Sequence, residues 1–374
     1  MEGFMLELRG KYNTAKVFTD NIDEETIAQI INLCNQDFSQ GSQIRIMPDC
    51  HAGMGCVIGF TADLGEKIIP NIVGVDIGCG MTTIELGKIN VNLKRLDKII
   101  NKNIPSGRNT HAGQVLKFPK IETLHCYREL KNTKRMERSI GTLGGGNHFI
   151  ELNKDDEDNL YLVIHSGSRN LGKQVADYYQ KIAIKQCRAQ GLDYPRDLCF
   201  LEGTWRERYL HDMQVCQEYA TINRETMANI ILDHLWGASL ADFEHFQTIH
   251  NYINFKDNIV RKGSISAYKG EKVLIPINMR DGSILAIGKG NPDWNYSAPH
   301  GAGRIMSRSK AKEKITMTEY AKAMEGIYTT SVNKSTLDEA PMAYKPIEEI
   351  INNIQDTVEI VKIITPVYNF KAGE

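Results

Sequence analysis

"KIIPNIVGVDIGCGMTTIEL", residues 67–86, is the stretch that decides the fold class of this chain. Its apolar, β-branched runs are typical of buried strands joined by tight, glycine-rich loops. Asp76 and Cys79 stand three residues apart among these glycines. They either belong to a packed loop with an inert cysteine or form a pair of metal ligands, for which the glycines would admit a bulky group close to the backbone.

Strands and helices are mixed along the rest of the chain. Apolar spacing predicts a first helix after "NIDEE" (21–25), helical sequence over 117–139 and 206–236, and a final strand over 358–370. The strands do not alternate strictly with helices, and no Pro/Gly/Ser-rich linker divides the chain. We therefore expect one α+β domain over residues 1–374, built around layered mixed sheets rather than a doubly wound sheet.

Composition narrows the classes of function. The 374 residues are 41% hydrophobic, and the net charge of −1 gives no global field for nucleic acid, so a polyanion would need a local basic cluster. The 8 cysteines have no framework spacing and no apolar signal segment opens the sequence, so we expect reduced thiols in the cytoplasm. No run approaches the roughly 20 apolar residues that a membrane span needs.

Histidines give the strongest functional signal, because several end an apolar run beside glycine or asparagine: His148, His165, His250 and His300. A single histidine of this kind is more often a hydrogen-bonded structural residue than a ligand. Together with the Asp–Cys pair, these imidazoles complete a mixed N/O/S set that favours a metal site. Thiolate and imidazole suit zinc, carboxylate and imidazole also suit manganese, and a thiolate can bridge two ions.

Glycines and arginines point to phosphate. Backbone N–H groups of "LGGGNH" (143–148) and "HGAGR" (300–304) can form anion-binding nests, and Arg169 and Arg304 can each donate two hydrogen bonds to a phosphate. The chain has neither a Walker motif nor a Rossmann fingerprint, so a nucleotide would bind in another way. His300 is either a nucleophile toward an activated phosphorus, forming a labile phosphoramidate, or a further metal ligand.

Two basic runs are candidates for binding a polyanion: "KNTKRMER" (131–138) and "RIMSRSKAKEK" (304–314). A charge run is usually a solvated helix face. The second run directly follows His300, which favours a place in the same cleft.

Taken in order, these motifs resemble the RtcB family of RNA ligases, from about residue 40 to the end of the chain. The matching stretches are "MPDCHAGMG", "GVDIGCG", "GGGNHFIEL", "HSGSRNLG", "HNYI", "RKGSISA", "HGAGRIMSR" and "DEAPMAYKPIEEI". The resemblance implies an α+β fold with a central metal and nucleotide cleft. It implies an enzyme that joins an RNA 3′-phosphate or 2′,3′-cyclic phosphate to a 5′-hydroxyl, using GTP and two Mn²⁺ ions, with Zn²⁺ as the alternative metal.

The resemblance also assigns roles to residues. It implies that His300 is guanylated and that Asp49 lies near the RNA end, and we expect Arg169 and Arg304 to hold RNA phosphates. The implied metal ligands, with Cys79 bridging, are Asp76, Cys79, His148, His165 and His250. The implied GTP contacts are Asn147, His148, Phe149, Ile150, Glu151, His250, Asn251, Pro276, Ile277, Asn278, Met279, Ser283, His300, Gly301, Ala302, Gly303 and Lys371.

The expected partners are RNA ends and an archease-type activator protein, with the chain itself a monomer. Three other functions remain open. A metal-dependent phosphohydrolase would open cyclic phosphates without joining ends. A paralogue could cap DNA 3′-phosphate ends, and a metal-stabilised RNA-binding protein would need no enzymatic step.

Overall fold

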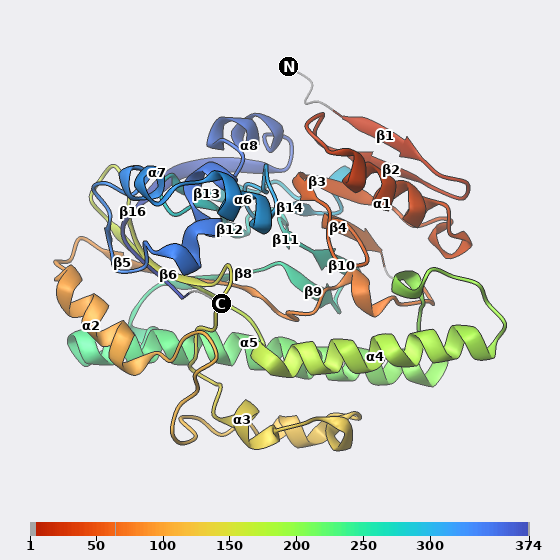
Figure 1. Ribbon diagram of the computed structural model, residues 1–374, viewed down its shortest axis with the longest axis horizontal. Helices are drawn as coiled ribbons and strands as arrows, with labels where there is room; N and C mark the ends of the chain where they lie inside the picture. The colour runs from red at the N-terminus through yellow and green to blue at the C-terminus, as the bar shows by residue number, and fades with distance from the viewer. Residues whose placement is uncertain (1–4, 64, 373–374) are drawn as a thin grey trace.

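The computed structural model describes residues 5–63 and 65–372, which form a single domain of mixed helices and sheets (Figure 1). The α+β class expected from the sequence is confirmed. A six-stranded sheet has the order β1 (Leu6–Arg9), β2 (Thr14–Val17), β3 (Arg45–His51), β4 (Ile58–Asp63), β10 (Ile259–Lys262) and β9 (Asn251–Asn254). Its neighbours are antiparallel except for β2 and β3, which run parallel.

A second, eight-stranded sheet is nearly closed. The backbone N–H of Leu274 donates to Thr248 Oγ1 at 3.2 Å, which joins its first strand to its last. The order is β12 (Lys272–Asn278), β13 (Gly282–Gly288), β16 (Val358–Lys371), β6 (Phe149–Lys154), β7 (Leu160–Ser166), β5 (Gly80–Gly87) and β8 (His245–Ile249), with β15 (Tyr328–Thr329) pairing beside β16. The short pair β11 (Ser264–Ser266) and β14 (Ser297–Pro299) contacts both larger sheets.

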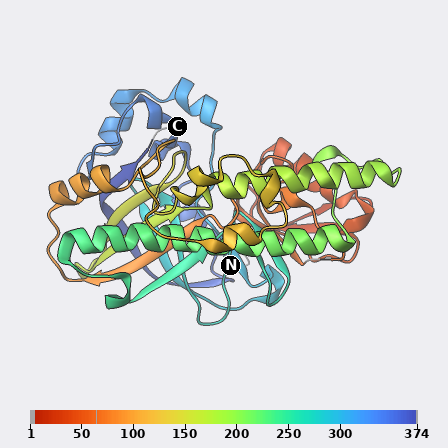
Figure 2. The same ribbon diagram turned by 90° about the horizontal axis from the view of Figure 1, so that it is seen from below.

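Two long helices, α4 (Arg169–Ala189) and α5 (Gly203–Trp236), lie side by side beneath the sheets (Figures 1 and 2). The shorter helices are α1 (Glu24–Cys34), α2 (Leu93–Asn103), α3 (Thr133–Glu137), α6 (Arg308–Lys314), α7 (Met317–Ala323) and α8 (Ile347–Asn353). The first half of α5, including Met213, packs into the core that α4 shares with the six-stranded sheet. Its second half, including Ile231, packs under the eight-stranded sheet, so α5 spans both cores.

Most elements expected from the sequence are present. The helix after "NIDEE" is α1, whose N-cap Asp23 accepts the Thr26 N–H at 2.9 Å. The long helix expected over 206–236 is α5, and the final strand is β16. Each of the 8 cysteines is a free thiol, as expected. None of the helices in the described part of the chain has the length and hydropathy of a membrane span.

The prediction of a helix over 117–139 is wrong. This segment forms 3₁₀ turns over Pro119–Thr123 and Tyr127–Glu129 and only the short α3. A side chain of the long helix α5 binds peptide groups of this segment. The Asp212 carboxylate accepts hydrogen bonds from the backbone N–H groups of His125 and Cys126 at 2.8 and 3.1 Å. A segment whose N–H groups are bound by side chains does not need helical hydrogen bonds.

The strands expected within residues 67–86 are confirmed only from Gly80 onward, where β5 begins. Pro70 opens a 3₁₀ turn, and Gly74 and Gly78 have φ values of +96° and +72°. Positive φ values are incompatible with a regular strand. The loop that holds Asp76 and Cys79 is therefore irregular up to the start of β5.

Candidate metal and nucleotide site

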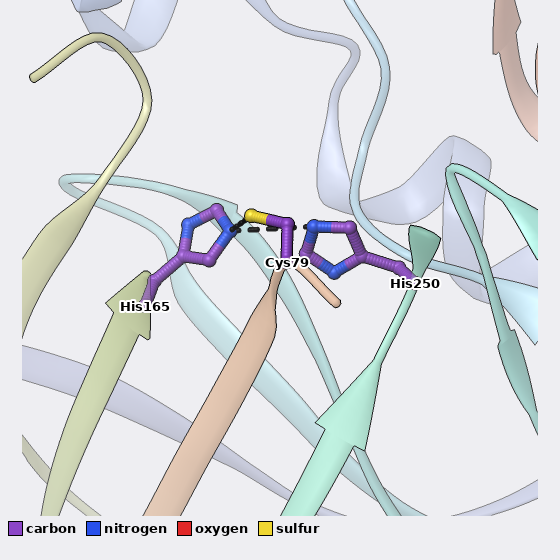
Figure 3. Close-up of side chains that lie close together, drawn as sticks. All are labelled: Cys79, His165 and His250. Atoms are coloured by element: carbon purple, nitrogen blue, oxygen red, sulfur yellow. Dashed lines mark hydrogen bonds between the residues drawn. The ribbon is translucent and has the colours of Figure 1, made fainter. Parts of the chain in front are cut away.

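Strand register brings four predicted ligands to one edge of the eight-stranded sheet. Cys79 immediately precedes β5, His250 immediately follows β8, and His165 is the penultimate residue of β7. These strands are adjacent and antiparallel, and Gly80 pairs with the final residues of both β7 and β8. His148 immediately precedes β6, the next strand. Figure 3 shows three of these side chains pointing toward one another from neighbouring strand ends.

Two groups of potential ligands share Cys79. One contains His165 and His250, the other Asp76 and His148, and within each group the ligand atoms lie within 4.8 Å of one another. Cys79 Sγ is 3.3 Å from His165 Nε2 and 3.4 Å from His148 Nε2. His165 Nε2 is 3.3 Å from His250 Nε2. Cys79 therefore lies within reach of the potential ligands of both groups.

The hydrogen bonds of two histidines leave their Nε2 lone pairs facing these groups. His148 Nδ1–H donates to the Leu143 carbonyl at 2.9 Å, and His165 Nδ1–H donates to the Asn147 carbonyl at 3.2 Å. Backbone carbonyls fix metal-ligating histidines in this tautomer. The His148 Nε2 lone pair then lies 2.9 Å from the Asp76 carboxylate. An imidazole nitrogen and a carboxylate oxygen this close can share one metal ion, so this donor set fits a metal.

Burial sets the protonation of the potential ligands. It lowers the pKa of His165 and of His250 well below the usual range, so both imidazoles are neutral, the form that binds metal. Burial raises the pKa of the Cys79 thiol well above its usual value, and the Asp76 charge raises it further. A metal ion would have to displace the thiol proton on binding.

The glycines beside Cys79 admit protein rather than a ligand. A Cβ at Gly78 would lie 2.8 Å from the Ala220 Cβ of α5, and one at Gly80 would lie 2.6 Å from the Thr248 carbonyl oxygen. Close approach of α5 and β8 therefore explains both glycines. This corrects the sequence interpretation, in which they made room for a bulky ligand.

A cavity of about 280 Å³ lies beside the metal-ligand groups and includes His165 in its wall. Twelve of the predicted GTP contacts line it: Asn147, Phe149, Glu151, Pro276, Ile277, Asn278, Met279, His300, Gly301, Ala302, Gly303 and Lys371. Segments far apart in the sequence thus form one enclosure. Burial raises the pKa of Glu151 in this wall to about 7, against the opposing effect of hydrogen bonds from Asn369 and Asn153.

His300 lies between the cavity and the metal-ligand groups. Its ring centroid is 4.9 Å from that of His250. The fully buried Asp49 carboxylate accepts hydrogen bonds from His300 Nδ1–H at 2.6 Å and from the backbone N–H groups of His300 and Gly301 at 3.1 Å. This contact keeps the proton on Nδ1 and leaves the Nε2 lone pair free, the form that a nucleophilic imidazole needs. Asp49, expected near the RNA end, contacts the predicted nucleophile itself.

Comparison with known proteins identifies the family. The family model described as "tRNA-splicing ligase RtcB" matches residues 29–372. The chain belongs to the RtcB family. It is 32% identical over 387 residues to the RNA-splicing ligase RtcB of Escherichia coli strain K12, covering 92% of the chain and 94% of that protein. It is 27% identical over 448 residues to the tRNA-splicing ligase RtcB of Methanococcus maripaludis, covering 96% and 93%.

A further RtcB relative, the RNA-splicing ligase RtcB2 of Escherichia coli strain ATCC 25922, is 28% identical over 341 residues, covering 82% of the chain and 81% of that protein. The family that the motifs indicated is confirmed. Membership supports a ligase that acts on RNA.

Five predicted GTP contacts of this RtcB chain lie outside the cavity wall: His148, Ile150, His250, Asn251 and Ser283. The two histidines belong to the metal-ligand groups. Ile150 packs into the core beneath β6. Asn251 accepts the Gly263 N–H at 2.9 Å and donates to the Asp76 carbonyl, so it supports the metal-ligand loop. Ser283 is buried in β13 beside Pro276.

Sequence reasoning missed five residues in the wall: His51, Ile58, Arg308, Glu339 and Tyr344. The Glu339 carboxylate lies 2.6 Å from both Lys371 Nζ and Arg308 Nη1, and it accepts a hydrogen bond from the Tyr344 hydroxyl at 2.6 Å. Burial alone would raise the pKa of Glu339, but Lys371 and Arg308 lower it to about 2. Arg308 lies in the basic run 304–314, and Glu339 and Tyr344 lie in the stretch "DEAPMAYKPIEEI", but neither stretch reveals that these side chains meet.

The two predicted phosphate-binding arginines differ in how they are held. Arg304 donates to the carbonyls of Met306 and Asp338 at 3.1 and 2.6 Å and to the Tyr344 hydroxyl at 3.2 Å. All three nitrogens of its guanidinium are therefore hydrogen-bonded within the protein. Arg169 is half-buried, and its Nη1 lies 3.1 Å from His148 Nδ1, beside a metal-ligand group.

The basic runs also separate. The run 131–138 includes α3, which packs on α4 beneath the sheets (Figure 1). The run 304–314 includes α6, whose first residue Arg308 lines the cavity. Of the two, only the second adjoins the site.

Proposed function

We propose that this protein is a GTP- and Mn²⁺-dependent RNA ligase that joins an RNA 3′-phosphate or 2′,3′-cyclic phosphate end to a 5′-hydroxyl end. RtcB membership supports RNA ligation. The observation that carries the finer proposal is the place of His300, which is bound by Asp49 and lies between the cavity and the two ligand groups. Residues 1–374 would act as one catalytic domain in the cytoplasm.

His300 carries the first step. Its Nε2 attacks the α-phosphorus of GTP held in the cavity, an N–P bond forms, and the bond from that phosphorus to pyrophosphate breaks. Asp49 holds the Nδ1 proton and stabilises the positive charge that the ring gains. Glu151 and Lys371 line the same cavity and would contact the nucleotide.

Two Mn²⁺ ions would be held by Asp76, Cys79, His148, His165 and His250. When bound, they would neutralise phosphate charge as Lewis acids. Arg169, beside His148, would hold an RNA phosphate with its guanidinium. Arg304, whose donors are engaged, would instead hold the cavity wall.

Two displacements follow. An oxygen of the RNA 3′-phosphate attacks the guanylated phosphorus, His300 leaves with its Nε2 lone pair restored, and an RNA–ppG end results. The 5′-hydroxyl then attacks the RNA 3′-phosphorus, its proton passes to water, and GMP leaves with the electrons of the broken P–O bond. A 2′,3′-cyclic end enters this sequence after water has hydrolysed it to the 3′-phosphate. The site contributes mainly the positioning of these groups.

The test is covalent labelling with α-labelled GTP and Mn²⁺. Wild-type protein is expected to retain label in an acid-labile, base-stable bond, and His300→Ala to retain none. His245→Ala removes an exposed histidine of β8 and is the matched control. Label in the His300→Ala variant would refute the nucleophile, and joined product without GTP would refute the mechanism.

The same reactions separate the other functions. A phosphohydrolase would open a 2′,3′-cyclic end without GTP and yield no joined product. A non-enzymatic RNA-binding protein would bind RNA equally well without His300 and form no adduct. A DNA-capping paralogue would transfer GMP to a DNA 3′-phosphate in preference to RNA. A parallel reaction with an archease-type activator tests that partner.

A further inference from the structure

Arg224 of α5 is fully buried behind the metal-ligand groups. Its Nη1 donates to the carbonyl oxygens of Gly78 and Ser166 at 2.8 and 2.9 Å. Its Nη2 donates to Gln247 Oε1 at 2.6 Å. These acceptors are uncharged carbonyl and amide oxygens, so the guanidinium meets polar groups of the sheet edge rather than a carboxylate.

Each of these acceptors adjoins a metal-ligand residue. The first immediately precedes Cys79, the second immediately follows His165, and the third lies on β8, shortly before His250. One planar side chain thus contacts the loop before β5, the end of β7 and the body of β8. Few side chains other than arginine offer a rigid fork that can span such acceptors.

Charge alone does not explain this placement. A buried guanidinium is costly and would repel divalent cations bound nearby, and the charges of Asp76 and Glu225 offset only part of that cost. Burial lowers the pKa of Arg224 to about 10, which reflects this cost. The hydrogen bonds of the guanidinium offset the cost of its burial. Gln247 is itself held in place, because its Nε2 donates to Glu225 Oε1 at 2.9 Å.

We propose that Arg224 is a positioning residue of the metal centre, whose guanidinium fixes the relative places of the backbone segments that carry Cys79, His165 and His250. It acts through the carbonyls of the sheet edge and through Gln247. The inference rests on the two-ion centre of the proposed function, and it adds a residue on a distant helix to what builds that centre.

The test is a Co²⁺ titration of EDTA-treated protein, without nucleotide or RNA. Wild-type protein is expected to bind two equivalents and to show thiolate-to-cobalt charge-transfer absorption. Arg224→Met and Arg224→Lys are expected to weaken binding roughly 10- to 100-fold and to reduce that absorption at saturating cobalt. Gln247→Met, which removes one contact, should weaken binding less. Arg208 is exposed on the same helix, and R208M and R208K should bind as wild type.

The lysine variant separates geometry from charge. Lysine keeps the positive charge but cannot hold these acceptors from one rigid plane. Wild-type cobalt affinity and absorption in R224K would overturn the inference. Melting of the metal-free variants reports their folding. If R224M does not fold, R224K and Q247M decide, and lower stability with unchanged cobalt binding would also overturn a positioning role.

The two proposals fail separately. Normal cobalt binding by wild-type protein without a GMP adduct would refute the proposed ligase mechanism alone. A GMP adduct in wild type, together with undisturbed cobalt binding in R224K, would refute the role of Arg224 alone.

Discussion

Asp49→Asn tests whether the buried carboxylate orients and activates His300. The Asp49 Oδ2 atom accepts hydrogen bonds from His300 Nδ1–H and from two backbone N–H groups. An asparagine carbonyl can accept the same bonds but carries no charge. Its NH₂ group would take the place of Oδ1, a buried atom without a hydrogen-bond partner among residues 5–63 and 65–372. The substitution therefore keeps the shape of the contact and removes its charge.

The expected cost follows from the change in that hydrogen bond. A bond to a charged group contributes about 1.5–3 kcal/mol and a neutral one about 1 kcal/mol, a difference of about 0.5–2 kcal/mol. The ring of His300 gains positive charge as its Nε2 bonds to phosphorus, so the loss falls on adduct formation. We expect the rate of adduct formation to fall roughly 2- to 30-fold.

The assay is the single-turnover rate of label transfer from α-labelled GTP at saturating GTP and Mn²⁺. Metal affinity should not change, because Asp49 belongs to neither metal-ligand group. Asp20→Asn, at an exposed position, is the matched control. A wild-type rate in D49N would refute the reasoning, and a matching fall in Mn²⁺ affinity would show that Asp49 acts on the metal centre instead.

Two further predictions concern the cavity wall. Lys371→Met removes the ion pair with Glu339 and should lower the free energy of unfolding by about 3 kcal/mol. This is the low end of the range for a buried ion pair, because Arg308 still faces the Glu339 carboxylate. Urea denaturation measures the change, and an unchanged midpoint would contradict the prediction. Burial raises the pKa of Glu151 from 4.5 to about 7, so the metal-free protein should lose up to about 3 kcal/mol of stability as pH rises through that interval, because the unfolded chain releases the proton first. Glu151→Gln should abolish this pH dependence, and equal slopes in both proteins would show that Glu151 is not its source.

The sequence was enough to select the residues of the candidate metal site, but not to show how the fold brings them together. Asp76, Cys79 and the histidines could be picked out because thiolate, imidazole and carboxylate groups in glycine-rich contexts are unusual. Their convergence could not be derived from spacing, because it depends on the register that pairs Gly80 with the ends of β7 and β8. Register is a property of the whole sheet and not of any local pattern.

Other features were beyond local reasoning for related reasons. A glycine in the sequence does not show what approaches its backbone. We expected a ligand at Gly78, but the neighbouring helix α5 lies there. Glu339 and Lys371 meet although neither lies in a motif with recognisable spacing. The segment 117–139 has helical composition, but Asp212 binds its peptide groups from another helix. In each case a distant tertiary partner decides the local structure.

A single sulfur atom belongs to both ligand groups, since Cys79 Sγ lies 3.3 Å from His165 Nε2 and 3.4 Å from His148 Nε2. Each of the two proposed cations would need this sulfur as a ligand, so its loss would weaken the binding of both. Oxidation or alkylation of this one atom would empty both positions at once. Until a cation displaces its proton, the sulfur stays a buried thiol that reacts slowly with electrophiles. Vulnerability to redox chemistry would thus be confined to the interval when the centre loads or unloads.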